Sequence, residues 1–140
     1  MLNLITGPKG SGKTKQMIDL ANDIVKKSNG NVVLIKKSQK GTVKADFNVR
    51  VISMDEYKEI ITLEEFVGFL YGMIAGDHDI ETIFIDGVLK QANITLDSLP
   101  AFLRKLSIIS AEYNIEFYAS ISADEKQIPK IDDFEYKIVG

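Results

Sequence analysis

The residues best suited to chemistry lie near the start of the chain, where Gly7 to Thr14 reads GPKGSGKT. This segment matches the pattern G-x-x-x-x-G-K-[ST] in full. Glycines let the backbone adopt conformations that a Cβ atom resists, so that successive N–H groups can face one anion. A helix that starts here adds the unpaired N–H groups of its first turn. The segment therefore predicts a binding site for phosphate groups.

The charge and the metal ligand of this site come from the end of the segment. Lys13 is expected to reach the β- and γ-phosphates of a nucleotide, and the Thr14 hydroxyl is expected to bind Mg²⁺. Pro8 stiffens the loop, and Lys9 adds a positive charge at its mouth. The predicted phosphate-binding residues are Gly7, Pro8, Lys9, Gly10, Ser11, Gly12, Lys13, Thr14 and Lys15. An ordinary glycine-rich turn is the alternative interpretation.

A second candidate, Asp86, ends the apolar run TIFID at residues 82–86. A carboxylate at the end of an apolar strand costs free energy unless an ion or hydrogen bonds compensate it. Because Mg²⁺ prefers oxygen ligands, Asp86 is predicted to hold this ion together with Thr14. The alternative is an Asp-Gly turn after a strand, since Gly87 follows.

The elements that must position these residues alternate between strands and helices. Apolar and β-branched runs predict strands at residues 2–6, 31–36, 49–53, 81–87, 115–122 and 134–139. Helical spacing of apolar residues predicts helices at 13–27, 62–76 and 98–114. Thr62 and Glu65 are expected to form a capping box, Ser98 an N-cap, and residues 37–48 a loop. This order predicts a three-layer α/β/α fold with a mainly parallel sheet of about five or six strands.

Length and composition bound the class of protein. The chain has 140 residues, of which 45% are hydrophobic and 26% charged, as expected of a single globular domain at residues 1–140. The absence of cysteine excludes disulfides and thiolate zinc sites, and it fits a reducing compartment. We expect no secretory signal and no membrane span, and hence a cytoplasmic protein. The net charge of −3 argues against a general attraction to nucleic acid.

Together the two motifs resemble those of the P-loop NTPase superfamily. In that superfamily an apolar strand ends in an aspartate that holds magnesium through water, as TIFID ends in Asp86. Two predicted strands lie between the motif strands, which is similar to the RecA-like branch, where another strand separates the motif strands in the sheet. The resemblance implies RecA-like strand order with ATP and Mg²⁺ as ligands. No Asn-Lys-x-Asp motif for reading guanine is present, which favours adenine.

The first residues also resemble the thymidine-kinase start, roughly G-P-M-x-S-G-K-T-x-x-L-I. Three features depart from that family. There is no cysteine for a zinc-bound lasso, IDGVLKQ stands where those kinases have Asp-Glu-Ala-Gln-Phe, and little chain follows the predicted sheet to form a base-recognition lid. A small nucleoside or metabolite kinase therefore stays an alternative.

The catalytic base is the least defined part of the predicted site. Gly87 stands where many P-loop ATPases carry a glutamate that activates water. RecA-like proteins can carry this glutamate at the end of a neighbouring strand, so Glu56 in VISMDEY is the first substitute and Asp55 the second. Both could instead belong to the start of a short helix. The predicted catalytic residues are Lys13, Asp86 and Glu56.

Other polar residues are weaker candidates. Ser120 or Ser122 could sense the γ-phosphate at the end of a strand, and Gln91 could orient a water molecule. The only arginines, Arg50 and Arg104, are not convincing as arginine fingers within one subunit. Hydrolysis by the isolated chain should therefore be slow.

Two stretches carry opposite charge. Residues 26–50 contain seven basic residues and one acidic residue, and residues 112–135 contain seven acidic and two basic residues. Solvated surface charge is the favoured interpretation of these stretches, and contact between copies of the chain or with a protein partner is the alternative. Nucleic acid is a weaker candidate partner, because Phe47 is the only aromatic residue among the basic residues of 26–50 that could stack on a nucleobase. His78 lacks a second histidine or a cysteine for a zinc site.

The sequence thus predicts a minimal NTPase that binds ATP with Mg²⁺ and has weak or partner-stimulated hydrolysis. Two alternatives stay open: the small kinase, and a non-catalytic nucleotide-sensing subunit of an assembly.

Overall fold

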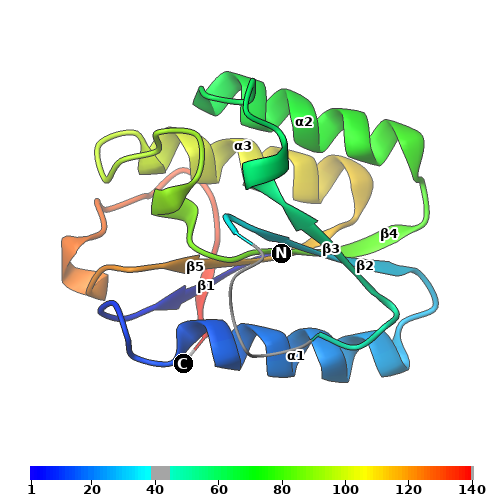
Figure 1. The fold of residues 1–140 in the computed structure, drawn as a ribbon. Helices are drawn as coiled ribbons and strands as arrows, with labels where there is room; N and C mark the ends of the chain where they lie inside the picture. Colours follow the sequence, from blue (N-terminus) through cyan, green and yellow to red (C-terminus); the bar gives the residue numbers. More distant parts are fainter. Residues whose placement is uncertain (39–44, 140) are drawn as a thin grey trace.

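A six-stranded sheet forms the middle layer of the structure (Figure 1), a computed structural model that describes residues 1–38 and 45–139. Its strands are β1 (Leu2–Thr6), β2 (Asn31–Lys36), β3 (Val49–Ser53), β4 (Ile80–Ile85), β5 (Glu116–Ile121) and β6 (Lys137–Ile138). They lie in the order β3-β2-β4-β5-β1-β6, and every described pairing is parallel. The predicted α/β fold with a parallel sheet is confirmed.

Helices cover both faces of the sheet. Helix α1 (Lys13–Lys27) lies on one face, and helices α2 (Leu63–Gly76) and α3 (Leu99–Tyr113) lie on the other (Figure 1). From β1 to β2 the chain moves along the sheet in one direction, and from β3 to β4 and β5 it moves back. Because such crossovers are right-handed, opposite directions of travel place the helices on opposite faces.

The central strands bury side chains on both faces. Phe84 of β4 packs towards α1 with Met17, whereas its neighbours Ile83 and Ile85 face the larger core under α2 and α3. All four side chains are fully buried. Strands covered on both sides need apolar residues at every position, which explains the continuous apolar runs in the sequence.

Short turns and caps end the elements. The 3-10 turns η1 (Met54–Glu56), η2 (Val88–Lys90) and η3 (Glu125–Gln127) follow strands β3, β4 and β5. The capping box of α2 is confirmed: the Thr62 hydroxyl accepts a hydrogen bond from the Glu65 N–H (3.1 Å), and the Glu65 carboxylate accepts one from the Thr62 N–H (2.9 Å).

Ser98 occupies the N-cap position of α3, as predicted, but its hydroxyl bonds to Thr95 and not to an N–H group of the helix. The bounds predicted for the last strand were wrong. The last strand is shorter than residues 134–139, because β6 pairs with β1 only at Lys137 and Ile138. Of the predicted loop at 37–48, residues 39–44 lie outside the described residues.

The carboxyl ends of β1, β4 and β5 meet at one edge of the sheet. Strand β5 lies between the other two, so the prediction that one strand separates the two motif strands is confirmed. At this end of the sheet the chain leaves β1 towards α1 on one face and leaves β4 towards η2 and α3 on the other. The segments that follow β1 and β4 therefore start towards opposite faces, and open parallel sheets bind ligands in the crevice formed at such a position.

Candidate functional site

The glycine-rich loop at residues 7–14 joins β1 to α1 in a conformation that needs glycine. Gly10 and Gly12 have φ angles of 84° and 87°, in the left-handed region that other residues rarely adopt. A Cβ atom at Gly7 would lie only 2.8 Å from the Ser11 hydroxyl oxygen. The Gly7 N–H donates to the Ala123 carbonyl (3.0 Å), which ties the loop to the segment after β5.

Helix α1 begins without a side-chain cap. Gly12 occupies the N-cap position, and the first turn contains no acidic residue. The Gln16 N–H donates to the Gly12 carbonyl (3.0 Å) and closes the first helical hydrogen bond. The N–H groups before it and the positive end of the helix dipole can therefore face an anion.

The Lys13 side chain folds into the loop. It is only 8% exposed, and its Nζ donates to the Pro8 carbonyl (2.7 Å) and more weakly to the Ser11 hydroxyl (3.5 Å). Burial lowers the pKa of Lys13, the negative charge of Asp86 raises it, and the positive charge of Lys90 lowers it. A bound anion would favour the charged form of this partly desolvated ammonium group.

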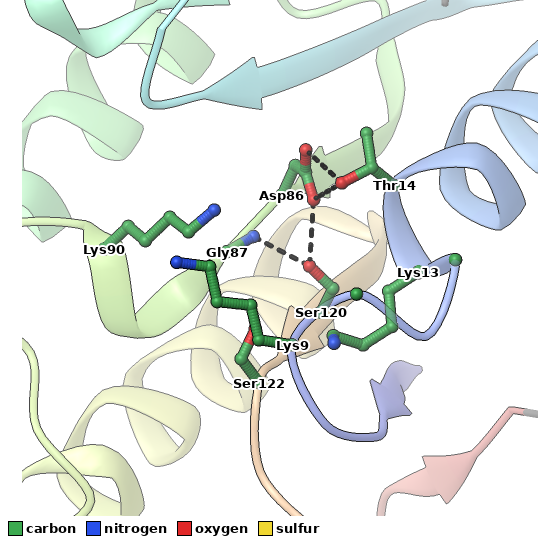
Figure 2. Close-up of a pocket in the computed structure, with 10 residues that line it drawn as sticks. Lys9, Lys13, Thr14, Asp86, Gly87, Lys90, Ser120 and Ser122 are labelled. Carbon is green, nitrogen blue, oxygen red and sulfur yellow. Dashed lines mark hydrogen bonds between the residues drawn. The ribbon is translucent and has the colours of Figure 1, made fainter. Parts of the chain in front are cut away.

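Asp86 follows β4 and faces the start of α1. The Thr14 hydroxyl donates to both carboxylate oxygens of Asp86 at 3.2 Å, and the Ser120 hydroxyl donates to Oδ1 at 3.1 Å (Figure 2). Ser120 in turn accepts a hydrogen bond from the Gly87 N–H (2.7 Å). This network holds the carboxylate at the edge of the sheet, between the ends of β1, β4 and β5.

Thr14 and Asp86 have the chemistry of a magnesium site. A hydroxyl and one carboxylate are ligands that Mg²⁺ uses together with water and phosphate oxygens. Among the described residues, no cluster of three or more His, Cys, Asp or Glu side chains could hold a metal ion. The residues therefore fit a magnesium ion that arrives with phosphate groups, and they do not fit a site built from protein ligands alone.

A cavity of about 310 Å³ lies between the loop and the ends of β4 and β5. Its lining residues are Lys9, Gly10, Gly12, Lys13, Thr14, Asp86, Gly87, Lys90, Ser120 and Ser122. Three ammonium groups and one carboxylate thus line the cavity, although the whole chain has a net charge of −3. This local positive charge favours an anionic ligand.

Four of the predicted phosphate-binding residues are not among those that line the cavity, namely Gly7, Pro8, Ser11 and Lys15. The Pro8 carbonyl and the Ser11 hydroxyl accept hydrogen bonds from the Lys13 ammonium group, so these two residues position Lys13. Lys15 lies exposed on α1, and its side chain forms an ion pair with Asp19 (2.9 Å).

The structure does not bring Glu56 to the cavity. Glu56 lies in η1, after the edge strand β3, and β2 separates β3 from β4. The neighbouring Asp55 pairs with Lys37 (3.5 Å) and does not line the cavity either. The catalytic role of Glu56 stays a prediction.

The other predicted polar residues differ in their access to the cavity. Ser120 is 1% exposed, and its hydroxyl is hydrogen-bonded to Asp86 and to the Gly87 N–H. Ser122 lines the cavity as well, and its role as a sensor of the γ-phosphate stays a prediction. Gln91 is 1% exposed and donates to the Asp86 carbonyl (3.3 Å), so it supports the turn after β4.

Neither arginine lines the cavity. Arg104 on α3 pairs with Asp133, and this hydrogen bond lowers the pKa of the Asp133 carboxyl. Arg50 and Phe47 are exposed near the β3 edge. The remaining lysines of the basic stretch at 26–50 include two, at positions 40 and 44, that lie outside the described residues.

Lys90 lines the cavity although it was not among the predicted site residues. This residue comes four positions after Asp86, and the turn η2 returns its side chain to the cavity (Figure 2). A lysine shortly after the strand-ending aspartate was the only signal. Without the turn geometry it was indistinguishable from a surface lysine.

No protein-family model matches the chain, and a search of curated proteins found no match. Within residues 1–38 and 45–139, none of the helices combines the length and the apolar character that crossing a membrane requires. The function is therefore inferred from the geometry of the site.

Proposed function

We propose that this chain is a minimal P-loop NTPase of the RecA-like type, which binds ATP together with Mg²⁺. One observation carries the proposal: a loop with left-handed glycines enters the uncapped start of α1, encloses Lys13 and faces the Thr14–Asp86 pair. Each part suits one portion of a metal–triphosphate complex.

The roles follow from the positions of the groups. The loop N–H groups and the Lys13 ammonium would bind the β- and γ-phosphates, and Lys13 would exchange its bond to the Pro8 carbonyl for bonds to phosphate. Thr14 and Asp86 would hold Mg²⁺ directly or through water. The ion, when bound, neutralises part of the phosphate charge.

Hydrolysis is proposed to be weak unless a partner stimulates it. Asp86 is the only carboxylate among the described residues that line the cavity, and Thr14 and Ser120 already engage it. Gly87 has a φ of 77°, so a glutamate at this position would be strained. Among the described residues that line the cavity, none therefore offers a carboxylate base beside Asp86 that could activate water.

Lys13→Ala tests the binding site. We expect ATP affinity in the presence of Mg²⁺, measured by titration calorimetry, to fall roughly 100-fold or more, because a charged hydrogen-bond donor to phosphate is lost. Lys105→Ala removes an exposed lysine of α3 and is the matched control, with wild-type affinity expected. Circular dichroism should show both variants folded. Wild-type affinity in folded Lys13→Ala would contradict the proposed site.

The reaction is tested by measuring phosphate release from ATP, alone and with a panel of nucleosides. Slow release without an acceptor supports the NTPase. Transfer that needs an acceptor supports the small kinase, and binding without turnover supports a nucleotide sensor.

A further inference from the structure

The side chain of Lys90 is packed against Gly87 at the position where any other residue would carry its Cβ atom. A Cβ atom built on Gly87 would lie 3.1 Å from Cδ of Lys90 and 3.6 Å from its Cε. The Lys90 N–H donates to the Gly87 carbonyl (2.9 Å) and closes the tight turn η2. The glycine after Asp86 therefore leaves room for the Lys90 stem to cross the turn and to reach the cavity.

Lys90 shares this cavity with two other lysines. Lys9 extends into it from the glycine-rich loop, and Lys90 extends into it from η2 (Figure 2). Among the ion pairs of the described residues, none includes Lys9, Lys13 or Lys90. Like charges gathered without ion-pair partners are stabilised when an anion binds between them.

The position of Lys90 selects one part of the ligand. The start of α1 and the loop form one side of the cavity, whereas η2 and the ends of β4 and β5 form the other. In the proposed binding mode, a nucleotide held by the loop N–H groups and Lys13 would place its terminal phosphate beside Asp86, and therefore on the side that carries Lys90.

We propose that Lys90 contacts the terminal phosphate and thereby makes the site prefer a nucleoside triphosphate over a diphosphate. This inference rests on the proposed function, because both concern the same cavity. A triphosphate carries one more negative charge than a diphosphate, and an ammonium–phosphate hydrogen bond is among the stronger kinds. Lys90 is thus a specificity-determining residue supplied by this chain itself.

The test compares ATP and ADP affinities, each with Mg²⁺, by titration calorimetry. Lys90→Met removes the charge and keeps an unbranched stem over Gly87, whereas Lys90→Arg keeps the charge. We expect Lys90→Met to weaken ATP binding about tenfold and to change ADP binding less than about twofold. Lys90→Arg should keep most of the preference for ATP. Lys105→Met, on α3, is the control and should match the wild type in both affinities.

Each outcome decides the proposal. A selective loss of ATP affinity in Lys90→Met supports it. Equal losses for ATP and ADP, no loss at all, or a wild-type protein that binds both equally would overturn it and leave the proposed function standing. A folded wild-type protein that binds neither nucleotide would overturn the proposed function and this inference together.

Discussion

Asp86 and Asp55 each follow a parallel strand of the same sheet, yet their surroundings differ. Asp86 accepts hydrogen bonds from Thr14 and Ser120 and lines the cavity at the edge of the sheet. The side chain of Asp55 is 52% exposed and has Lys37 as its ion-pair partner. Local sequence marks both as acids after apolar strands, and only one of them lies at the candidate site.

The difference follows from the order of the strands. Strand β4 has β2 and β5 as neighbours, so the loop after it meets the loops that follow β5 and β1. Strand β3 is the outermost strand on its side of the sheet and pairs with β2 alone among the described strands. The turn after β3 is therefore separated from the glycine-rich loop by the ends of β2, β4 and β5. An acid at a strand end becomes part of a site when neighbouring loops converge on it.

The largest expected difference between the two aspartates is in Mg²⁺-dependent binding. Asp86→Asn should reduce the gain in ATP affinity on adding Mg²⁺ by about 10–100-fold, because a group that holds the ion loses its charge. Asp55→Asn is the matched control and should change this gain less than about twofold. Titration calorimetry with and without Mg²⁺ measures both, and equal effects would remove the distinction between the two strand ends.

Folding stability should also distinguish the two strand ends. Ser120→Ala leaves the buried Gly87 N–H without its partner and should lower the free energy of unfolding by about 1–3 kcal/mol. For a chain of this length, Tm should fall by roughly 3–10 °C. Ser53→Ala at the end of β3 loses only a long 3.5 Å bond to the Lys37 carbonyl and should cost less than about 1 kcal/mol. Thermal unfolding of both variants gives the comparison, and a reversed order would contradict it.

A smaller effect is expected from pH. Burial holds the pKa of Lys13 below its usual value of 10.5 in the free protein, and bound phosphate would raise this pKa. ATP therefore binds more tightly to the protein with protonated Lys13, so the ATP affinity has its highest value at a pH below the pKa of Lys13 in the free protein. It should decrease by up to about tenfold per pH unit as the pH rises through that pKa. Calorimetry from neutral pH upward tests this, with circular dichroism to show that the protein remains folded. A constant affinity over this range would argue against contact between Lys13 and phosphate.

The smallest effect is expected at Glu56. Its position after β3, outside the cavity, indicates that Glu56→Gln changes the rate of phosphate release less than about twofold. The Asp86→Asn variant, measured in the same assay, supplies the contrast. A loss of tenfold or more in Glu56→Gln, at unchanged ATP affinity, would instead restore Glu56 as the catalytic base.

Most of the fold could be predicted from local patterns. Strands β1, β2 and β3 and helix α1 have the predicted bounds, because apolar runs and helical spacing reflect burial in a two-sided sheet. The hydrogen-bond partner of the Ser98 hydroxyl and the length of β6 were not predicted, because each depends on a particular partner, Thr95 in one case and β1 in the other. Such pairings are not visible in local sequence.

The sequence by itself determined the glycine-rich loop, since its conformation depends on residues that are adjacent in the chain. Glycines at fixed spacing between a strand and a helix specify the left-handed turn at the start of α1, and this turn is the one proposed to bind phosphate. Only the tertiary structure decided which acid faces that loop, how Ser120 links Asp86 to Gly87, and that Lys90 returns to the cavity. These contacts join residues from different strands and turns, and the order in which the strands pack brings them together.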